Sequence, residues 1–193
     1  MPAPKNALAP QSANALASQR FPLQTAPMSP FDRALQDYPY LQDKKLYGVT
    51  TPNPKESRLL EFYPPDEPGA PSSPRPKELP MGNVGVQIFS NKVRPVDVLA
   101  DYVSHHAVKT DPVLQALYSE FDASVDPAAL KRRYDTHRKK FGEKRPYEQW
   151  KESTGLPELF RGYTFNQWDN AEEMYTPQQL EILNRVRGYV GVK

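Results

Sequence analysis

Apolar residues recur at helical spacing through the second half of the chain, and helix start signals recur with them. Asp111 and Asp126 each precede a proline, so a capping side chain is followed by the residue best suited to the first helical position. Thr176 and Gln179 have the spacing of a capping box, and Gly142 is suited to end a helix. The predicted helices span residues 96–108, 112–122, 127–141 and 177–190.

Residues 146–168 read PYEQWKESTGLPELFRGYTFNQW and hold six aromatic side chains, including both tryptophans of the chain. Aromatic rings bury the largest area per residue, so this segment is predicted to form a core. Gly155 and Gly162 are predicted to divide it into short helices and turns, with one turn at Arg161-Gly162-Tyr163. The last predicted helix carries an apolar stripe, which we expect to pack on this aromatic segment.

Two short runs rich in valine, isoleucine, phenylalanine and tyrosine are predicted to be strands, Leu59–Tyr63 and Val84–Phe89. Seven prolines lie between them, and this density favours an extended loop. A structureless loop of this length is uncommon inside a compact domain and often marks a binding or assembly segment.

The N-terminal pattern differs, because residues 1–31 hold six prolines and no acidic residue, with only Lys5 and Arg20 charged. This composition is typical of a disordered tail, and the alternative is an arm that becomes ordered on a partner. Between residues 31 and 47 apolar side chains return, although Pro39 limits any helix to about two turns. The candidate anchors, which would grip the chain's own domain or another chain, are Phe21, Leu23, Phe31, Leu35, Tyr38 and Leu41.

Composition supports a small folded domain joined to an extended segment, since 22 of 193 residues are proline and the hydrophobic share is 38%. We therefore predict a mainly α fold, with a small helical domain, one or two short β strands and a long extended proline-rich N-terminal arm. The expected organisation is an extended or disordered arm at 1–57, a proline-rich extended segment at 58–83 and a mainly helical domain at 84–193.

Several classes of chemistry are excluded or left without support. The absence of cysteine excludes disulfides, thiol catalysis and thiolate zinc sites. The net charge of +2 is too small to indicate nucleic acid or a membrane surface by itself. No apolar run approaches the roughly 18 residues of a membrane span. Because phosphate-cradling glycine loops, G-x-S-x-G and zinc-finger spacings are also missing, we expect no cofactor and no assigned catalytic residue.

Asp97, Asp101 and His105 are spaced four apart and share one face of a predicted helix. A carboxylate and an imidazole at this spacing suit a metal ion or a proton transfer, so Asp101 and His105 are the candidate metal ligands. The alternatives are a solvated helix face, which the pattern favours, and a surface that contacts a partner.

The helix predicted at 127–141 is strongly basic. Its candidate phosphate contacts are Lys131, Arg132, Arg138 and Lys139. Long basic side chains spread round a helix more often form its solvated face, and we favour that interpretation. Tyr134 and Phe141 are seven residues apart and are predicted to form the buried stripe of this helix.

The segments LLEFYPPDEPGAP, VRPVDVLADYVSHHAVKTDPVLQALYSEF, GEKRPYEQWKESTGLPELFRGYTFNQWD and MYTPQQLEILNRVRGYV occur in this order over about residues 58–190. This arrangement resembles a module of virion-associated proteins of tailed bacteriophages, particularly short-tailed ones. The resemblance rests on scattered aromatics, glycines and prolines, so it assigns no catalytic residue.

What the resemblance implies is a structural component of the virion, present in the host cytoplasm during assembly. Its partners would be other virion proteins, contacted in multiple copies of a symmetric assembly at the tail or the head–tail junction. Two alternatives remain. One is a metal-assisted hydrolase that uses Asp101 and His105 together with an acid such as Glu61 or Asp111. The other is a nucleic-acid-binding protein that uses the basic helix at 131–140.

Overall fold

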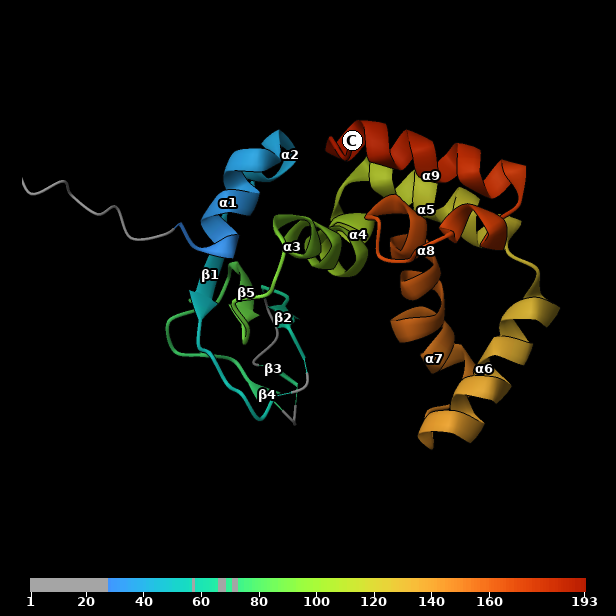
Figure 1. Ribbon diagram of the computed structural model, residues 1–193, viewed down its shortest axis with the longest axis horizontal. Helices are drawn as coiled ribbons and strands as arrows, with labels where there is room; N and C mark the ends of the chain where they lie inside the picture. Colours follow the sequence, from blue (N-terminus) through green and yellow to red (C-terminus); the bar gives the residue numbers. More distant parts are fainter. Residues whose placement is uncertain (1–27, 57, 66–68, 71–72) are drawn as a thin grey trace, which may run out of the picture.

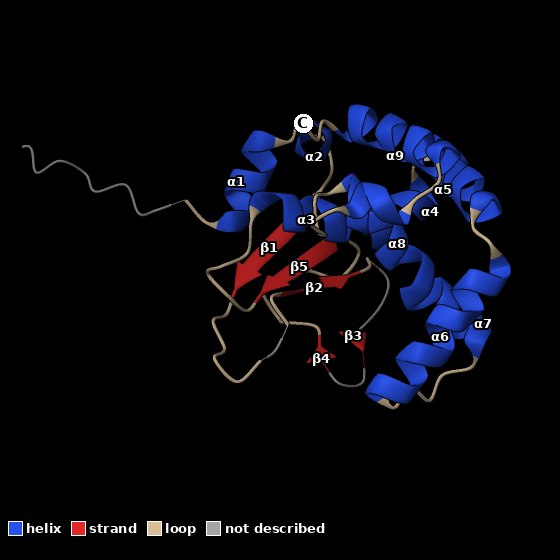
Figure 2. Ribbon diagram, turned by 45° about the vertical axis from the view of Figure 1, so that its right-hand side comes forward, coloured by secondary structure: helices blue, strands red, loops and turns tan. Residues whose placement is uncertain are grey.

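The computed structural model describes residues 28–56, 58–65, 69–70 and 73–193 (Figure 1). It is mainly helical with a small sheet, which confirms the predicted fold class. The helix α3 (Pro95–Tyr102) lies over the sheet, and a layer formed by α5 (Pro112–Ser124), α8 (Leu156–Thr164) and α9 (Pro177–Val190) lies beyond it (Figures 1 and 2). Within the described part of the chain, no helix has the length and apolar character needed to cross a membrane.

The sheet has three strands in the order β1 (Leu46–Thr50), β5 (Val84–Ile88) and β2 (Leu60–Tyr63). β5 pairs in parallel with β1 and antiparallel with β2. A separate two-residue ladder joins β3 (Gly69–Ala70) to β4 (Ser73–Pro74). The two predicted strands are confirmed as β2 and β5, and the sheet gains a third strand from the segment expected to be an arm.

The helices α1 (Pro30–Asp37) and α2 (Pro39–Gln42) also come from that segment, and α1 packs against α3. Phe31, Ala34 and Leu41 are buried in the main core. The boundary expected at residue 57 therefore does not mark the edge of the folded domain, because the candidate anchors Phe31 and Leu41 are buried in the chain's own core. Residues 1–27 of the expected arm lie outside the described residues.

The predicted helix at 96–108 is a continuous run of α3, a π-helical turn η1 (Val103–Ala107) and α4 (Val108–Thr110). Asp111 caps α5 by accepting hydrogen bonds from the backbone nitrogens of Val113 and Leu114. Asp126 caps α6 (Pro127–Phe141), which ends at Gly142 with φ of 69°. These start and stop predictions are confirmed.

The aromatic segment forms a helical run rather than a set of turns. It comprises α7 (Tyr147–Trp150), a π-helical turn η2 (Lys151–Gly155) and α8, and the short helix η3 (Ala171–Met174) follows it. Gly155 and Gly162 do not interrupt the run, so the predicted breaks and the turn at residues 161–163 are wrong. A Cβ atom would lie 2.5 Å from the Trp150 ring at Gly155 and 2.3 Å from the Trp168 ring at Gly162. Both glycines therefore make room for indole rings.

Among the described residues, two clusters of buried side chains make the core. The main cluster fills the space between the sheet and the helices, and α9 contributes Leu183, Val186 and Val190 to it, as predicted. A second cluster of Leu130, Tyr134, Trp150 and Leu156 joins α6 to the run of α7, η2 and α8. Figure 2 shows α6 leading away from α5 and α7 returning toward α8. Phe141 is 65% exposed, so the prediction that it shares the buried stripe of α6 with Tyr134 is wrong.

Candidate functional site

Buried Asp101 lies in a cluster with His105 and Arg161, which are partly exposed, so the predicted pair is joined by a residue from α8. The Asp101 side chain is 8% exposed, and its Oδ1 lies 3.8 Å from His105 Nε2 and 3.6 Å from Arg161 Nη1. Its Oδ2 accepts no hydrogen bond from any described residue. The ring of Phe62 stacks on His105 with the centroids 6.1 Å apart, so the cluster lies where β2, the π turn and α8 meet.

The other acids considered with this pair are engaged elsewhere. Asp97 lies 2.7 Å from Arg94 Nη2 and accepts a hydrogen bond from Gln167 Nε2. Asp111 caps α5, and Glu61 forms an ion pair with Arg58 at 2.6 Å. Among the described residues, no group of three His, Asp or Glu side chains is placed to hold a metal ion.

Burial governs the protonation of this cluster. It raises the pKa of Asp101, although His105 and Arg161 act in the opposite direction. Burial lowers the pKa of His105, and the nearby Asp101 opposes this shift while Arg161 and Lys109 reinforce it. Both shifts favour the uncharged forms of Asp101 and His105. The geometry is that of a packing contact of α3 and the π turn with β2 and α8.

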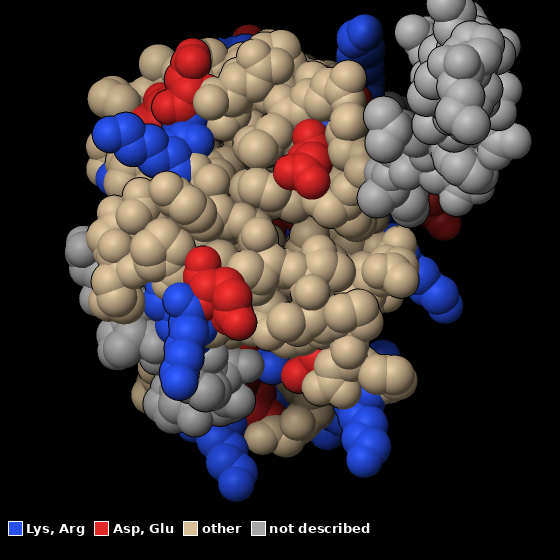
Figure 3. Space-filling model, turned by 90° about the vertical axis from the view of Figure 1, so that its left-hand side faces the viewer, with Lys and Arg blue, Asp and Glu red and all other residues tan. Residues whose placement is uncertain are grey.

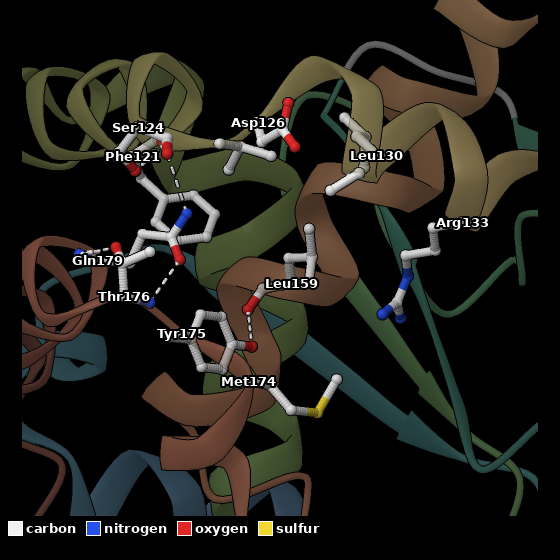
Figure 4. Close-up of a pocket in the computed structure, with 12 residues that line it drawn as sticks. Phe121, Ser124, Asp126, Leu130, Arg133, Leu159, Met174, Tyr175, Thr176 and Gln179 are labelled. Atoms are coloured by element: carbon white, nitrogen blue, oxygen red, sulfur yellow. Dashed lines mark hydrogen bonds between the residues drawn. The ribbon is translucent and has the colours of Figure 1, made fainter.

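A more accessible site lies between α6, α8 and the start of α9. A cavity of about 360 Å³ opens there, and Figure 4 shows the side chains that line it. Its walls are fixed by hydrogen bonds that Tyr175 Oη donates to the Leu159 carbonyl and Gln179 Nε2 donates to the Ser124 carbonyl. The lining side chains are mostly apolar and come from Phe121, Ser124, Val125, Asp126, Ala129, Leu130, Arg133, Leu159, Met174, Tyr175, Thr176 and Gln179.

A second depression of about 680 Å³ adjoins the first and shares Arg133 and Met174 with it. The guanidinium of Arg133 lies 5.1 Å from the centroid of the Trp168 ring and 3.3 Å from Glu158 Oε2. The residues that line this part are Arg133, Thr136, His137, Lys140, Phe141, Glu158, Trp168 and Met174. Because the two depressions share a wall, we treat them together as one feature, the α6 groove.

The basic side chains of α6 divide into paired and unpaired groups. Lys131 lies 2.7 Å from Asp135, and Arg132 lies 3.7 Å from Asp126. Arg138 and Lys139 are exposed, and no ion pair to another described residue involves them. Of the four predicted phosphate contacts, Lys131 and Arg132 are therefore paired with nearby carboxylates. Arg138 and Lys139 have no ion pair within the described residues. On the face turned away from α6, acidic and basic side chains are scattered among uncharged ones (Figure 3).

The predicted partner-binding anchors mostly serve the chain's own core. Phe31 and Leu41 are buried, while Leu35 and Tyr38 are partly buried and pack against the same cluster. Phe21 and Leu23 lie outside the described residues.

The α6 groove was not predicted from the sequence, because Phe141 was assigned to a buried stripe and Met174 carried no pattern. One signal could have indicated it, since Arg133, His137 and Lys140 share a helix face with Phe141.

Comparison with known proteins adds no family to this description: no protein-family model, curated protein or solved structure matches the chain.

Proposed function

We propose that this chain is a non-enzymatic structural and assembly protein of a tailed phage particle that binds neighbouring virion subunits. The phage assignment rests on the resemblance over residues 58–190. The binding role rests on one observation, the α6 groove, which is an accessible depression with an apolar part and a polar part.

The composition of the groove supports a contact with protein. Aromatic residues, methionine and arginine are enriched in protein interfaces, and the groove presents Tyr175, Trp168, Met174 and Arg133 together. Met174 is 52% exposed and Phe141 is 65% exposed, so both leave apolar area for a partner to cover.

The segment before residue 28 adds to this proposal. It is rich in proline, and it carries the two remaining candidate anchors, Phe21 and Leu23. Extended segments of this composition can wrap a large surface on a partner, since each anchor adds buried area while the entropy of ordering is lost only on binding. Arms of this kind suit a subunit that contacts several neighbours in a symmetric particle.

Mass spectrometry of purified phage particles, with quantification against the known coat subunits, tests this proposal. The expected result is that the chain is present in every preparation at a fixed copy number. Its absence from intact, infectious particles would reject a structural role.

Nucleic-acid binding is the second candidate function, and one observation favours it. The exposed side chains of Arg138 and Lys139, with Lys140 beside them, form no ion pair with another described residue. Binding through such groups releases counterions and must weaken steeply as salt rises. A titration with duplex and single-stranded DNA over a range of salt would show a steep slope if this function is correct and a flat response if it is not.

A further inference from the structure

We infer that the α6 groove binds an acidic segment of a neighbouring polypeptide, with one bulky apolar side chain of that segment inserted beside Leu159 and Tyr175. This inference rests on the proposed function as a subunit-binding protein. It goes further by assigning the site and the chemistry of the partner.

The apolar end of the groove defines the first requirement on the partner. Leu130 and Phe121 form its floor, and Leu159, Tyr175 and Met174 form its walls. The cavity of about 360 Å³ falls in the size range of pockets that accept ligand groups. Protein interfaces commonly gain most of their affinity from a bulky side chain that fills such a pocket.

Several polar groups at this end already have partners within the chain. Asp126 accepts the capping hydrogen bond from Ala128 and lies 3.7 Å from Arg132. The Tyr175 hydroxyl donates to Leu159, and the Gln179 amide donates to Ser124. An apolar side chain can therefore enter beside Leu159 without displacing the hydrogen bonds of Tyr175 and Gln179.

The other end of the groove is cationic. Lys140 lines it, and its ammonium lies 5.1 Å from the centroid of the Phe141 ring without an ion pair to any described carboxylate. Arg138, Lys139 and Lys144 lie close by in the sequence and also lack such a pair within the described residues. Since the nearest uncompensated charge is positive, an acidic side chain is the complementary group at this end.

A polypeptide fits the groove better than a nucleic acid does. Glu158 and Asp126, with side chains 44% and 60% exposed, are carboxylates on the walls of the two parts. A phosphodiester chain carries a negative charge at every nucleotide. Its phosphates would be repelled by these carboxylates and would have no polar partners in the apolar pocket. A peptide can place its acid at Lys140 and its apolar side chain at Leu159.

The chain's own N-terminal segment does not meet the same requirement. Residues 1–27 contain no acidic residue, and their only charged side chains are those of Lys5 and Arg20. The acidic segment must therefore come from elsewhere in the assembly.

The groove itself offers a way to measure this binding. Trp168 lines the cationic end, whereas Trp150 is fully buried in the second core cluster. Tryptophan emission of the full chain can therefore report occupation of the groove. The probe is a blocked peptide that joins a leucine and a phenylalanine to a run of glutamates. Its controls are the same peptide with glutamine for glutamate and a thymidine oligonucleotide of equal charge.

Two groove variants and two matched controls test the assignment. Lys140→Glu should weaken peptide binding about fivefold, because it reverses one charge at the acidic contact. Met174→Asp should weaken it about tenfold, because it removes apolar contact at the shared wall. Lys139→Glu makes the same charge change on the same helix outside the groove lining, and Met81→Asp replaces a methionine that is 56% exposed in the loop before β5. Both controls should change binding by less than about twofold.

Three results would overturn the inference: no saturable response to the peptide, equal losses for Lys139→Glu and Lys140→Glu, or a response to the oligonucleotide that exceeds the response to the peptide. The equal losses would indicate attraction by the general charge of α6, and the oligonucleotide result would indicate a nucleic-acid site. These outcomes are separate from the test of the proposed function. If the chain is in particles and the peptide fails, only the groove assignment fails. If the peptide binds and the chain is absent from particles, only the virion role fails.

Discussion

Gly155 and Gly162 sit inside helices where only the absence of a side chain allows an indole ring to approach. The Trp150 ring is completely buried, and the Trp168 ring forms part of the α6 groove. Glycine ordinarily destabilises a helix interior relative to alanine. Each of the two glycines therefore lowers local helix stability but allows an indole ring to pack closely. The result is that the position of Trp168 depends on Gly162.

Replacing Gly162 by alanine should destabilise the protein by about 1–3 kcal/mol, because a Cβ atom would lie 2.3 Å from the Trp168 ring. Gly188 is the matched control, since it also lies inside a helix but has open space around its Cα. Gly188→Ala should stabilise the protein by about 0.5–1 kcal/mol through helix propensity. Urea denaturation measures both changes, and a stabilising effect of Gly162→Ala would show that the close contact is absent.

The pKa of His105 leads to a prediction about acid stability. Burial lowers this pKa in the folded protein below its ordinary value of 6.5. The unfolded chain then binds the proton more readily, so the contribution of His105 is present above pH 6.5 and is lost as pH falls toward the folded pKa. The raised pKa of Asp101 has the opposite effect on stability. The stabilising contribution of Asp101 is present below pH 3.8, its ordinary pKa, and is lost as the pH rises through its pKa in the folded protein.

Removing the imidazole should therefore make stability less sensitive to acid. His105→Gln should lose less unfolding free energy than the wild type between about pH 7 and pH 5.5. His106 also has a pKa lowered by burial, so His106→Gln is the parallel variant that leaves the His105 contribution in place. Denaturant titrations at the two pH values make the comparison, and an identical pH dependence in wild type and His105→Gln would refute the assignment.

At the scale of elements, Asp111 connects three parts of the fold. It caps α5 and also accepts hydrogen bonds from the hydroxyls of Tyr40 in α2 and Tyr189 in α9. Asp126 caps α6 in the same way but is largely exposed and has no comparable partners in neighbouring helices among the described residues. The two caps therefore have the same local role and different structural consequences.

Asp111→Ala should cost about 2–4 kcal/mol, which combines the loss of a cap with the loss of two hydroxyl partners. Asp126→Ala should cost about 1 kcal/mol, the usual value for a cap alone. Thermal or urea unfolding of the two variants gives the difference. Equal losses would mean that the tyrosine hydrogen bonds contribute nothing to stability.

The elements that could be predicted are those specified by local signals. An acidic cap followed by proline determines where α5 and α6 begin, and Gly142 ends α6 in the left-handed conformation that glycine adopts easily. β1 was missed because it contains Gly48 and forms only by pairing with β5, which lies far away in the sequence. The π turns were missed for a related reason, since nothing local distinguishes them from the α-helices that they extend.

The site was harder to predict than the elements. Asp101 and His105 were identified by their spacing, yet Arg161 joins them from a helix about sixty residues later, and only the fold brings it there. The α6 groove combines Phe141 and Lys140 with Trp168 and Met174, which no periodic pattern connects. Phe141 remains exposed because Gly142 ends the helix there and the second core cluster contains Tyr134 instead.

At the scale of the whole molecule, the segment of residues 28–50 is part of the folded domain. α1 packs against α3, β1 pairs with β5, and the Phe31 ring packs onto Gly48. These contacts place the beginning of the described chain on the opposite side of the molecule from α6 (Figure 1).

Deletion of residues 1–45 should therefore unfold or strongly destabilise the protein, because it removes three buried side chains from the main core. Phe31→Ala alone should cost about 3 kcal/mol. Circular dichroism melts of the deletion and of Phe31→Ala measure these effects against the full chain. A deleted protein with an unchanged melting temperature would mean that residues 28–45 are a dispensable arm.

The central claim is that the α6 groove holds a segment of a neighbouring subunit in the assembled particle. Its most direct test replaces Met174 by a photo-cross-linking amino acid, irradiates purified particles and identifies the linked peptide by mass spectrometry. The same amino acid at Met81, which is exposed in the loop before β5, is the control. The predicted result is a cross-link from position 174 to an acidic segment of another virion protein that carries a bulky apolar residue. Cross-links only to nucleic acid, or no more cross-linking from position 174 than from position 81 in particles that contain the chain, would contradict the claim.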